Sequence, residues 1–185
     1  MATWGTHFRV TENILQSYYN LDRKHFTIGN IAPDCCIPNE NWSKFTPSKE
    51  VSHFFLKNGT DFLSYESKFF LIRDVDFYFK YLNVIDNNKN NVRYSFIFGY
   101  FIHLLTDNLW NYFIMRPLKE KFLKELQKDP NFIWKVKKDW YDLDKIYLTE
   151  RKNGIFWTDF LDADYSESFL DFLPKEGIKI GRAHV

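Results

Sequence analysis

The chain has 185 residues, of which 45% are hydrophobic and 20% aromatic, and its 25 basic and 24 acidic residues leave a net charge of +1. This length fits one domain with a sizeable, ring-rich core. The balanced charge gives no electrostatic footprint for a nucleic-acid backbone or an anionic membrane surface, so no nucleic-acid partner is expected. Cys35 and Cys36 are neighbours, which excludes a disulfide framework.

We find no signal peptide and no membrane span in the sequence. The first residues lack a basic region followed by an apolar stretch, and the most apolar segment, 96–105, is too short for a membrane span. We therefore expect a cytoplasmic protein without a transmembrane segment. The last six residues, 180–185, read like a translated sequencing adapter. We interpret them as an artefact that follows a domain of residues 1–179, which we expect to be truncated at its C-terminal end. The alternative is a genuine disordered tail.

The first half of the chain alternates helix and loop signals. Apolar residues at helical spacing predict a helix over 7–19. Two prolines predict a turn or loop over 29–38, and 41–47 also reads as a loop. Ser48 is a candidate N-cap for a helix that carries His53 near its first turns.

The second half is predicted to be mostly helical. The expected helices are, in chain order, Asp74 or Asp76 to about 84, 92–115, 117–128, 130–150 and 158–173. The polar run 86–91 is predicted to be a loop. Segment 92–115 is apolar on most sides and should be the central buried helix, and Pro130 is placed in the first turn of its helix. Strand signals are weak, so the predicted fold class is all-α.

The sharpest local motif is His103-Leu-Leu-Thr-Asp107. Residues four apart share a helix face, so an imidazole and a carboxylate point together from a helix that is otherwise apolar. A buried carboxylate needs a partner, because desolvating it alone costs several kcal/mol. Taken alone, the motif favours a plain internal hydrogen-bonded pair over a pair of metal ligands.

Three further groups lie upstream in separate segments. Asp34 follows a proline in Gly-Asn-Ile-Ala-Pro-Asp, His53 lies in Ser-His-Phe, and His7 lies in Trp-Gly-Thr-His. Nitrogen and oxygen ligands from separate segments suit zinc in a catalytic site, where an open position holds water. Together with His103 and Asp107, these groups are of the types that such a site uses.

These motifs, in this order and ending with His-Leu-Leu-Thr-Asp-Asn-Leu-Trp, resemble the bacterial zinc-dependent phospholipase C family. The single-strand-specific zinc nucleases are distant cousins on the same helical fold. The resemblance covers about residues 4–147, most of the chain. It implies a single-domain helical bundle, zinc as the cofactor, and hydrolysis of a phosphodiester by metal-activated water, with a phospholipid as one candidate substrate.

The resemblance also implies roles for single residues. The matches to the family's first zinc are Asp34, His53, His103 and Asp107. Asp107 would bridge to a second zinc that takes His7. For the mechanism, we expect Asp34 or a second metal to orient the attacking water. In secreted members an N-terminal tryptophan adds its amine and carbonyl to this second zinc; Trp4 is the nearest match but is internal here.

The sequence departs from the family after the His103–Asp107 motif, where the family places two more histidines and a carboxylate. Asp139, Asp142 and Asp144 could offer oxygen ligands, although a solvated acidic face is the plainer interpretation. We therefore expect one well-formed zinc site, a second one through His7, and no complete trinuclear centre. The alternative function is a catalytically impaired helical protein that keeps one zinc site.

The remaining candidates favour structural roles. His25 is interpreted as a surface or supporting histidine, Cys35 and Cys36 as structural, and the segment 135–138 as a solvated basic face. Three residues near the motif are candidates to line the pocket: Tyr100, Asn108 and Trp110. For the two aromatic rings, packing in the core is the plainer interpretation. A phosphohydrolase of the HD type needs an adjacent His-Asp pair, and a serine hydrolase a Gly-x-Ser-x-Gly elbow; the sequence has neither.

Overall fold

The computed structural model of the chain describes residues 1–41, 43–55, 72–86, 91–161, 167, 169–174 and 176–178. Helices dominate these residues, and their only sheet is a short antiparallel pair of β1 (Ile37–Pro38) and β2 (Phe45–Thr46). The predicted all-α class is confirmed. The interpretation of residues 180–185 as an artefact concerns residues outside the described part.

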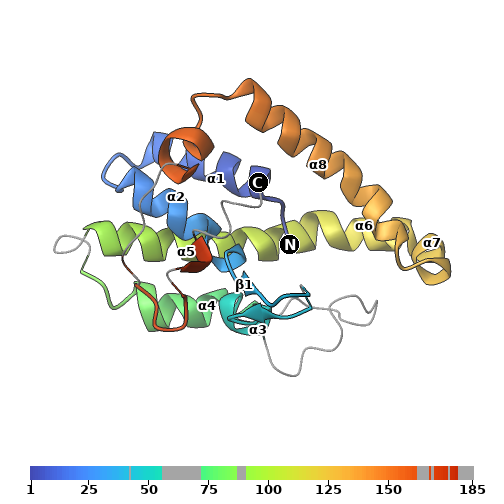
Figure 1. Cartoon of the computed structure of the whole chain (residues 1–185), viewed down its shortest axis with the longest axis horizontal. Coiled ribbons are helices and arrows are strands. Elements are labelled where there is room, and N and C mark those ends of the chain that lie inside the picture. Colours follow the sequence, from blue (N-terminus) through green and yellow to red (C-terminus); the bar gives the residue numbers. More distant parts are fainter. Residues whose placement is uncertain are drawn as a thin grey trace.

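The helices lie around one long central helix, α5 (Figure 1). In chain order the helical elements are α1 (Trp4–Ser17), α2 (Arg23–Ile31), the 3-10 turn η1 (Ala32–Asp34), α3 (Lys49–Ser52), α4 (Asp74–Phe77), the π-helical η2 (Tyr78–Leu82), α5 (Asn91–Trp110), the π-helical η3 (Asn111–Met115), α6 (Arg116–Lys121), α7 (Leu123–Lys128), α8 (Phe132–Glu150) and the π-helical η4 (Phe156–Leu161). In Figure 1, α1 and α2 lie above α5, and α3 and α4 lie below it. From α7 at one end of the molecule, α8 returns towards α1.

The core is built from aromatic rings around α5, as its composition predicts. Phe96, Tyr100 and Leu104 of α5 are fully buried. The ring of Tyr100 stacks on Phe77 of α4 with 4.9 Å between centroids. Burying a large apolar side chain contributes about 1.5–3 kcal/mol, so these rings anchor the central helix. None of the described helices is both long and apolar enough to cross a membrane.

Two glycines allow α2 and α5 to touch along their backbones. A Cβ atom on Gly29 would lie 2.1 Å from the carbonyl oxygen of Phe96, and one on Gly99 would lie 2.2 Å from that of Phe26. The predicted loop over 29–38 is therefore wrong at its start, because Gly29 belongs to α2. Close helix packing here outweighs the low helix propensity of glycine.

Several other element boundaries also differ from the prediction. α1 begins earlier, at Trp4, because the hydroxyl of Thr3 accepts a hydrogen bond from the backbone N–H of Thr6 at 3.4 Å. The predicted single helix over 117–128 is divided at Phe122 into α6 and α7. The predicted loop over 41–47 contains β2. Ser48 does precede α3, but α3 is a single turn and His53 directly follows it.

The C-terminal predictions need two corrections. Pro130 lies before α8 rather than in its first turn. The carboxylate of Asp129 accepts a hydrogen bond from the N–H of Asn131 at 2.9 Å, and this contact closes a turn ahead of the helix. The predicted helix over 158–173 is only partly present: η4 ends at Leu161, and 169–173 form bends and turns. Residues 87–90 of the predicted loop and 162–166 of this helix lie outside the described residues. The helix predicted from Asp74 is confirmed by α4 and η2.

Candidate metal centre

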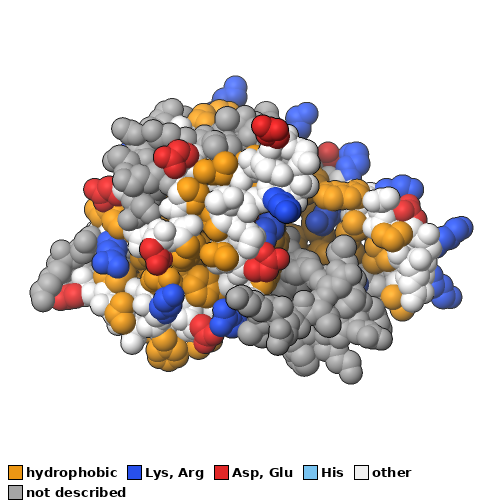
Figure 2. Space-filling view, turned by 60° about the horizontal axis from the view of Figure 1, so that its bottom comes forward, with side chains coloured by type: hydrophobic (Ala, Val, Ile, Leu, Met, Phe, Trp, Pro, Cys, Tyr) orange, Lys and Arg blue, Asp and Glu red, His pale blue; other side chains and the backbone are white. Residues whose placement is uncertain are grey.

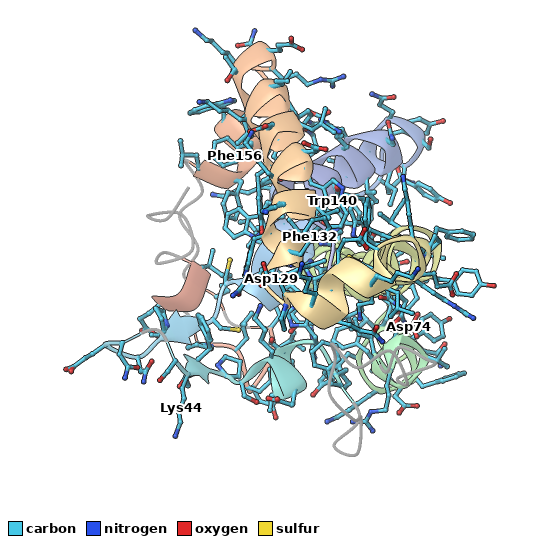
Figure 3. All side chains as sticks on the ribbon, turned by 90° about the vertical axis from the view of Figure 1, so that its right-hand side faces the viewer. Lys44, Asp74, Asp129, Phe132, Trp140 and Phe156 are labelled. Atoms are coloured by element: carbon cyan, nitrogen blue, oxygen red, sulfur yellow. The ribbon has the colours of Figure 1, made fainter. Side chains whose placement is uncertain are left out.

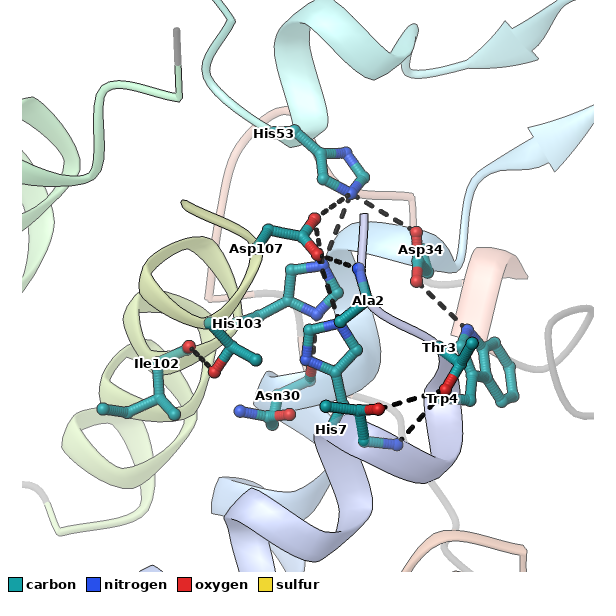
Figure 4. Close-up of polar contacts among 12 residues, drawn as sticks. Ala2, Thr3, Trp4, His7, Asn30, Asp34, His53, Ile102, His103 and Asp107 are labelled. Atoms are coloured by element: carbon teal, nitrogen blue, oxygen red, sulfur yellow. Dashed lines mark hydrogen bonds and ion pairs between the residues drawn. The ribbon is translucent and has the colours of Figure 1, made fainter. Parts of the chain in front are cut away.

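Four separate segments of the chain meet at one buried point (Figure 4). The residues that meet there are His7 of α1, Asp34 of η1, His53 after α3, and His103 and Asp107 of α5. Their donor atoms form two overlapping groups, one of His7, Asp34 and His103 and the other of His53, His103 and Asp107, each within 4.8 Å. The structure thus brings all five residues singled out in the sequence into one cluster.

The local structure explains how each side chain reaches the cluster. His103 and Asp107 are one helical turn apart on the face of α5 that meets α1 and α2. Pro33 lies within the 3-10 turn that begins at Ala32 and ends at Asp34, and the indole N–H of Trp4 donates to the Asp34 Oδ2 atom at 3.2 Å. The chain before His53 is held by the Tyr100 hydroxyl, which donates to the carbonyl of Ser52 at 2.5 Å.

Hydrogen bonds on the outer side fix the orientation of two imidazoles. The Nδ1 atom of His103 lies 2.6 Å from the carbonyl oxygen of Asn30. A carbonyl only accepts, so this nitrogen carries the proton and Nε2 presents its lone pair to the cluster. His53 has its Nδ1 atom 2.9 Å from the hydroxyl of Ser52, which leaves its Nε2 atom facing the same point. Metal-binding histidines are commonly oriented in this way.

Several distances between donor atoms are close to those between the ligands of a tetrahedral zinc ion. The Nε2 atom of His53 lies 3.4 Å from the Nε2 atom of His103 and 3.3 Å from the Oδ1 atom of Asp34. The Oδ2 atom of Asp107 lies 3.6 Å from His103 Nε2 and 3.8 Å from His53 Nε2. Ligand bonds of about 2.0–2.1 Å in a tetrahedron separate the donors by about 3.3 Å. His53, His103 and Asp107 are therefore spaced close to the separation of zinc ligands, and Asp34 lies beside His53 at the edge of this group.

Several buried atoms of the cluster have no hydrogen-bond partner among the described residues. They are both ring nitrogens of His7 and the Oδ2 atom of Asp107. The lone pair of His103 Nε2 also faces this carboxylate oxygen with no proton between them. Leaving such groups buried and unpaired costs about 1–3 kcal/mol each. A cation in the cluster would satisfy the Oδ2 atom of Asp107 or one ring nitrogen of His7, together with the lone pair of His103, so the donor set fits a bound metal.

The electrostatics favour the protonation states that bind a metal. Burial opposes the charge on both carboxyl groups, but the imidazole of His53 beside Asp34 and that of His7 beside Asp107 hold the pKa of each carboxyl below its ordinary value. Burial, followed by the neighbouring His7, lowers the pKa of His103 from 6.5 to about 3. Near neutral pH the site therefore holds carboxylates and a neutral imidazole at His103, as metal ligation requires.

The two oxygens of Asp107 face different neighbours. Oδ2 faces His103 and His53, whereas Oδ1 lies 3.6 Å from the Nε2 atom of His7 and accepts a hydrogen bond of 2.6 Å from the backbone N–H of Ala2. The ring of His7 stacks on that of His103 with 3.9 Å between centroids. Asp107 can thus contact two neighbouring cations, one through each oxygen.

The acidic residues of α8 are not part of the metal-binding groups found among the described residues. Asp139 and Asp142 are exposed, and Asp142 pairs with Lys138, which fits the solvated face. Asp144 is half-buried, but it accepts hydrogen bonds from the hydroxyl of Thr3 at 2.8 Å and from the N–H of Gly5 at 3.1 Å. It therefore holds the start of α1.

Two other predictions concern residues near the cluster. His25 binds the carboxylate of Asp22 at 2.7 Å, at the N-cap of α2, in the supporting role expected. Cys35 and Cys36 are buried and form no disulfide among the described residues, and the thiol of Cys36 donates to the carbonyl of Pro33 at 3.4 Å. These side chains support the segments that carry the cluster.

A pocket of about 890 Å³ opens beside the cluster. Its walls are the segment 1–5, the β1–β2 and α3 region, and one face of α8, and Asp34 is the ligand candidate that lines it. Figure 3 looks onto α8, with Phe132 and Trp140 along it. Tyr100, Asn108 and Trp110 do not line this pocket: Tyr100 is buried, Asn108 donates to the carbonyl of Ile72, and Trp110 packs on Trp140.

Sequence reasoning missed some of the groups that matter here. The interpretation of 135–138 as a solvated face is wrong for Lys137, which is half-buried and lines the pocket. It lies on the same face of α8 as Trp134 and Trp140, and this spacing was a signal that the sequence offered. The carbonyl of Asn30 and the N–H of Ala2 are backbone groups, which no side-chain motif could identify.

Comparison with known proteins agrees with the geometry. A family model described as zinc dependent phospholipase C matches residues 6–110, which include all five clustered residues. The resemblance inferred from the motifs is therefore confirmed. No curated protein and no solved structure matches the chain.

Proposed function

Because the chain belongs to the zinc-dependent phospholipase C family, we propose that it is a zinc-dependent hydrolase that cleaves a phosphodiester. The observation that carries this proposal is the convergence of three buried imidazoles and two carboxylates at spacings that suit zinc. The pocket beside them is large enough for a small phosphoester group. A phospholipid remains one candidate substrate.

We assign the ligand roles from the family resemblance, and the contacts of each residue support them. Asp34, His53, His103 and Asp107 would hold one zinc ion, and His7 would hold a second with the other oxygen of Asp107. Zinc at such a site supplies Lewis-acid chemistry, which withdraws charge from the phosphoryl oxygens and activates water. The stacked His7 and His103 rings keep the two positions adjacent.

Asp34 also has a place in the chemistry. Its side chain is 12% exposed, whereas Asp107 is 1% exposed, so Asp34 is the carboxylate that can contact a molecule in the pocket. The Trp4 indole fixes its Oδ2 atom. We assign to Asp34 the orientation of the attacking water.

The experiment measures zinc content and hydrolysis together. We expect the purified protein to bind zinc and to hydrolyse an aryl phosphodiester and a choline phospholipid, with activity lost on chelation and restored by zinc. His103→Ala should abolish both, whereas the control His25→Ala, outside the cluster, should keep both. Activity that survives chelation and His103→Ala would contradict the proposal.

The second candidate is a metal-binding helical protein with impaired catalysis. It is favoured by one observation: the acidic residues of α8 do not replace the missing downstream ligands, since Asp139 and Asp142 are exposed. If the protein binds one zinc ion tightly but hydrolyses none of a broad panel of phosphoesters, this second candidate function is favoured.

Partners other than a small phosphoester are not part of the proposal. Figure 2 shows basic and acidic side chains mixed over the described part of one face, in line with the net charge of +1. Such a mixture does not favour a nucleic-acid backbone. A cytoplasmic location stays a prediction, which fractionation of the native cells would test.

A further inference from the structure

Two lysines project into the pocket from opposite walls. Lys49 comes from α3, directly beside the segment that carries His53, and Lys137 comes from the middle of α8. Burial and then the positive charge of Lys49 lower the pKa of Lys137, so the two ammonium groups act on one another. They belong to segments far apart in the sequence and share one space.

Neither ammonium group has a carboxylate within ion-pair distance among the described residues. Each instead lies over an aromatic ring that also lines the pocket: Lys137 over Trp134, at 4.9 Å from its centroid, and Lys49 over Phe45, at 6.0 Å. Cation–π contacts hold an ammonium group in position without neutralising its charge. The pocket thus keeps two positioned cations whose charges are available to a ligand.

Positive side chains outnumber negative ones on the pocket walls once Asp34 is assigned to the metal cluster. The described lining includes three lysines, Lys49, Lys137 and Lys145, and two carboxylates, Asp34 and Asp144. Asp34 belongs to the metal cluster, and Asp144 is held by Thr3 and Gly5. A phosphodiester carries one negative charge, which zinc would neutralise, so the lysines remain to attract a further anionic group.

We propose that Lys49 and Lys137 bind an anionic group of the substrate other than the cleaved phosphodiester, and so select anionic over cationic head groups. This inference rests on the proposed function for the position of the phosphodiester. A quaternary ammonium would meet two like charges in this pocket, and the rings of Trp134 and Phe45 already face lysines. A carboxylate or a second phosphate would receive hydrogen bonds from both ammonium groups.

Binding of two small phosphates of similar length tests the proposal. Phosphoglycolate carries a carboxylate where phosphocholine carries its trimethylammonium group. Calorimetry on the zinc-loaded full chain should show tighter binding of phosphoglycolate. In the double variant Lys49→Gln/Lys137→Gln, its Kd should rise roughly tenfold, as for the loss of two charge contacts, while the Kd of phosphocholine stays level or falls.

The matched control is Lys44→Gln/Lys138→Gln, which removes the same charge from exposed residues outside the pocket lining. It should leave both Kd values unchanged. Equal or tighter binding of phosphocholine by the unaltered protein, or equal effects of the two double variants, would overturn the inference. Because the readout is binding, a protein that binds zinc and prefers phosphoglycolate but hydrolyses nothing would overturn only the proposed function.

Discussion

His103 has two differently used ring nitrogens. Its Nδ1 atom donates to the carbonyl of Asn30, and its Nε2 atom faces Asp107 and His53. The ring is fully buried and stacked on His7, so water cannot stabilise an added proton. A proton on this ring therefore competes directly with a metal ion for the same lone pair.

Acid should destabilise the metal-free protein through this residue. The pKa of His103 is about 3 in the folded chain and 6.5 for an ordinary histidine, so between these values the unfolded chain binds more protons. The stability is complete above about pH 6.5 and is lost as the pH falls towards 3. Thermal unfolding with chelator present should show the Tm falling over this window.

His103→Gln is the matched variant for this titration. It removes the titrating group, so the decline in Tm between pH 6.5 and 5 should flatten. In this range the lowered pKa values of Asp34 and Asp107 keep both carboxyl groups ionised, so these groups do not contribute to the decline. An equally steep decline in the variant would show that other groups cause the effect.

At the scale of elements, the contact between α2 and α5 positions the site. It brings the carbonyl of Asn30 onto His103, one turn after the close approach at Gly99. The side-chain amide of Asn30 also donates to the carbonyl of Gly99 at 3.2 Å. A shift of α2 away from α5 would therefore move the group that orients the central imidazole.

Adding one methyl group at this contact should destabilise the fold. Gly29→Ala and Gly99→Ala would each place a Cβ atom within 2.2 Å of a backbone carbonyl oxygen, which cannot move aside as a side chain can. We expect each to lower the free energy of unfolding by about 1–3 kcal/mol, measured by urea denaturation. Gly154→Ala, whose Cβ would meet nothing closer than 3.0 Å, should cost less.

The same contact shows what could be predicted from the sequence. The spacing of His103 and Asp107 was enough to place both on one face of a helix, because helical periodicity is local. The helical state of Gly29 was not predictable, because it depends on the Phe96 carbonyl, distant in sequence. Asp34 and His53 were identified by family resemblance, since no local rule joins separate segments at one point.

At the scale of the whole molecule, the cluster ties the first half of the chain together. α1, η1, the end of α3 and α5 each contribute at least one of its residues. In the metal-free chain these segments bring hydrogen-bond acceptors against one another, such as the facing lone pairs of His103 Nε2 and Asp107 Oδ2. Metal binding would therefore stabilise the global fold as well as the site.

Zinc should raise the thermal stability of the whole chain. A ligand present at 100 times its Kd adds about 2.7 kcal/mol, which corresponds to a rise of several degrees in Tm for a chain of this size. Differential scanning calorimetry with zinc and with chelator measures the difference. It should vanish in Asp107→Asn, and a shift of equal size in that variant would place the bound zinc elsewhere.

The path of α8 has a consequence for how the molecule could change. All five clustered residues come from the first 107 positions, whereas α8, which returns across the molecule in Figure 1, lines the pocket and contributes none of them. Replacing the inward side chains of α8 could therefore retune which head group is accepted while the chemistry stays intact. Under the proposed function, the metal ligands and part of the substrate selection would therefore lie on different elements of the chain.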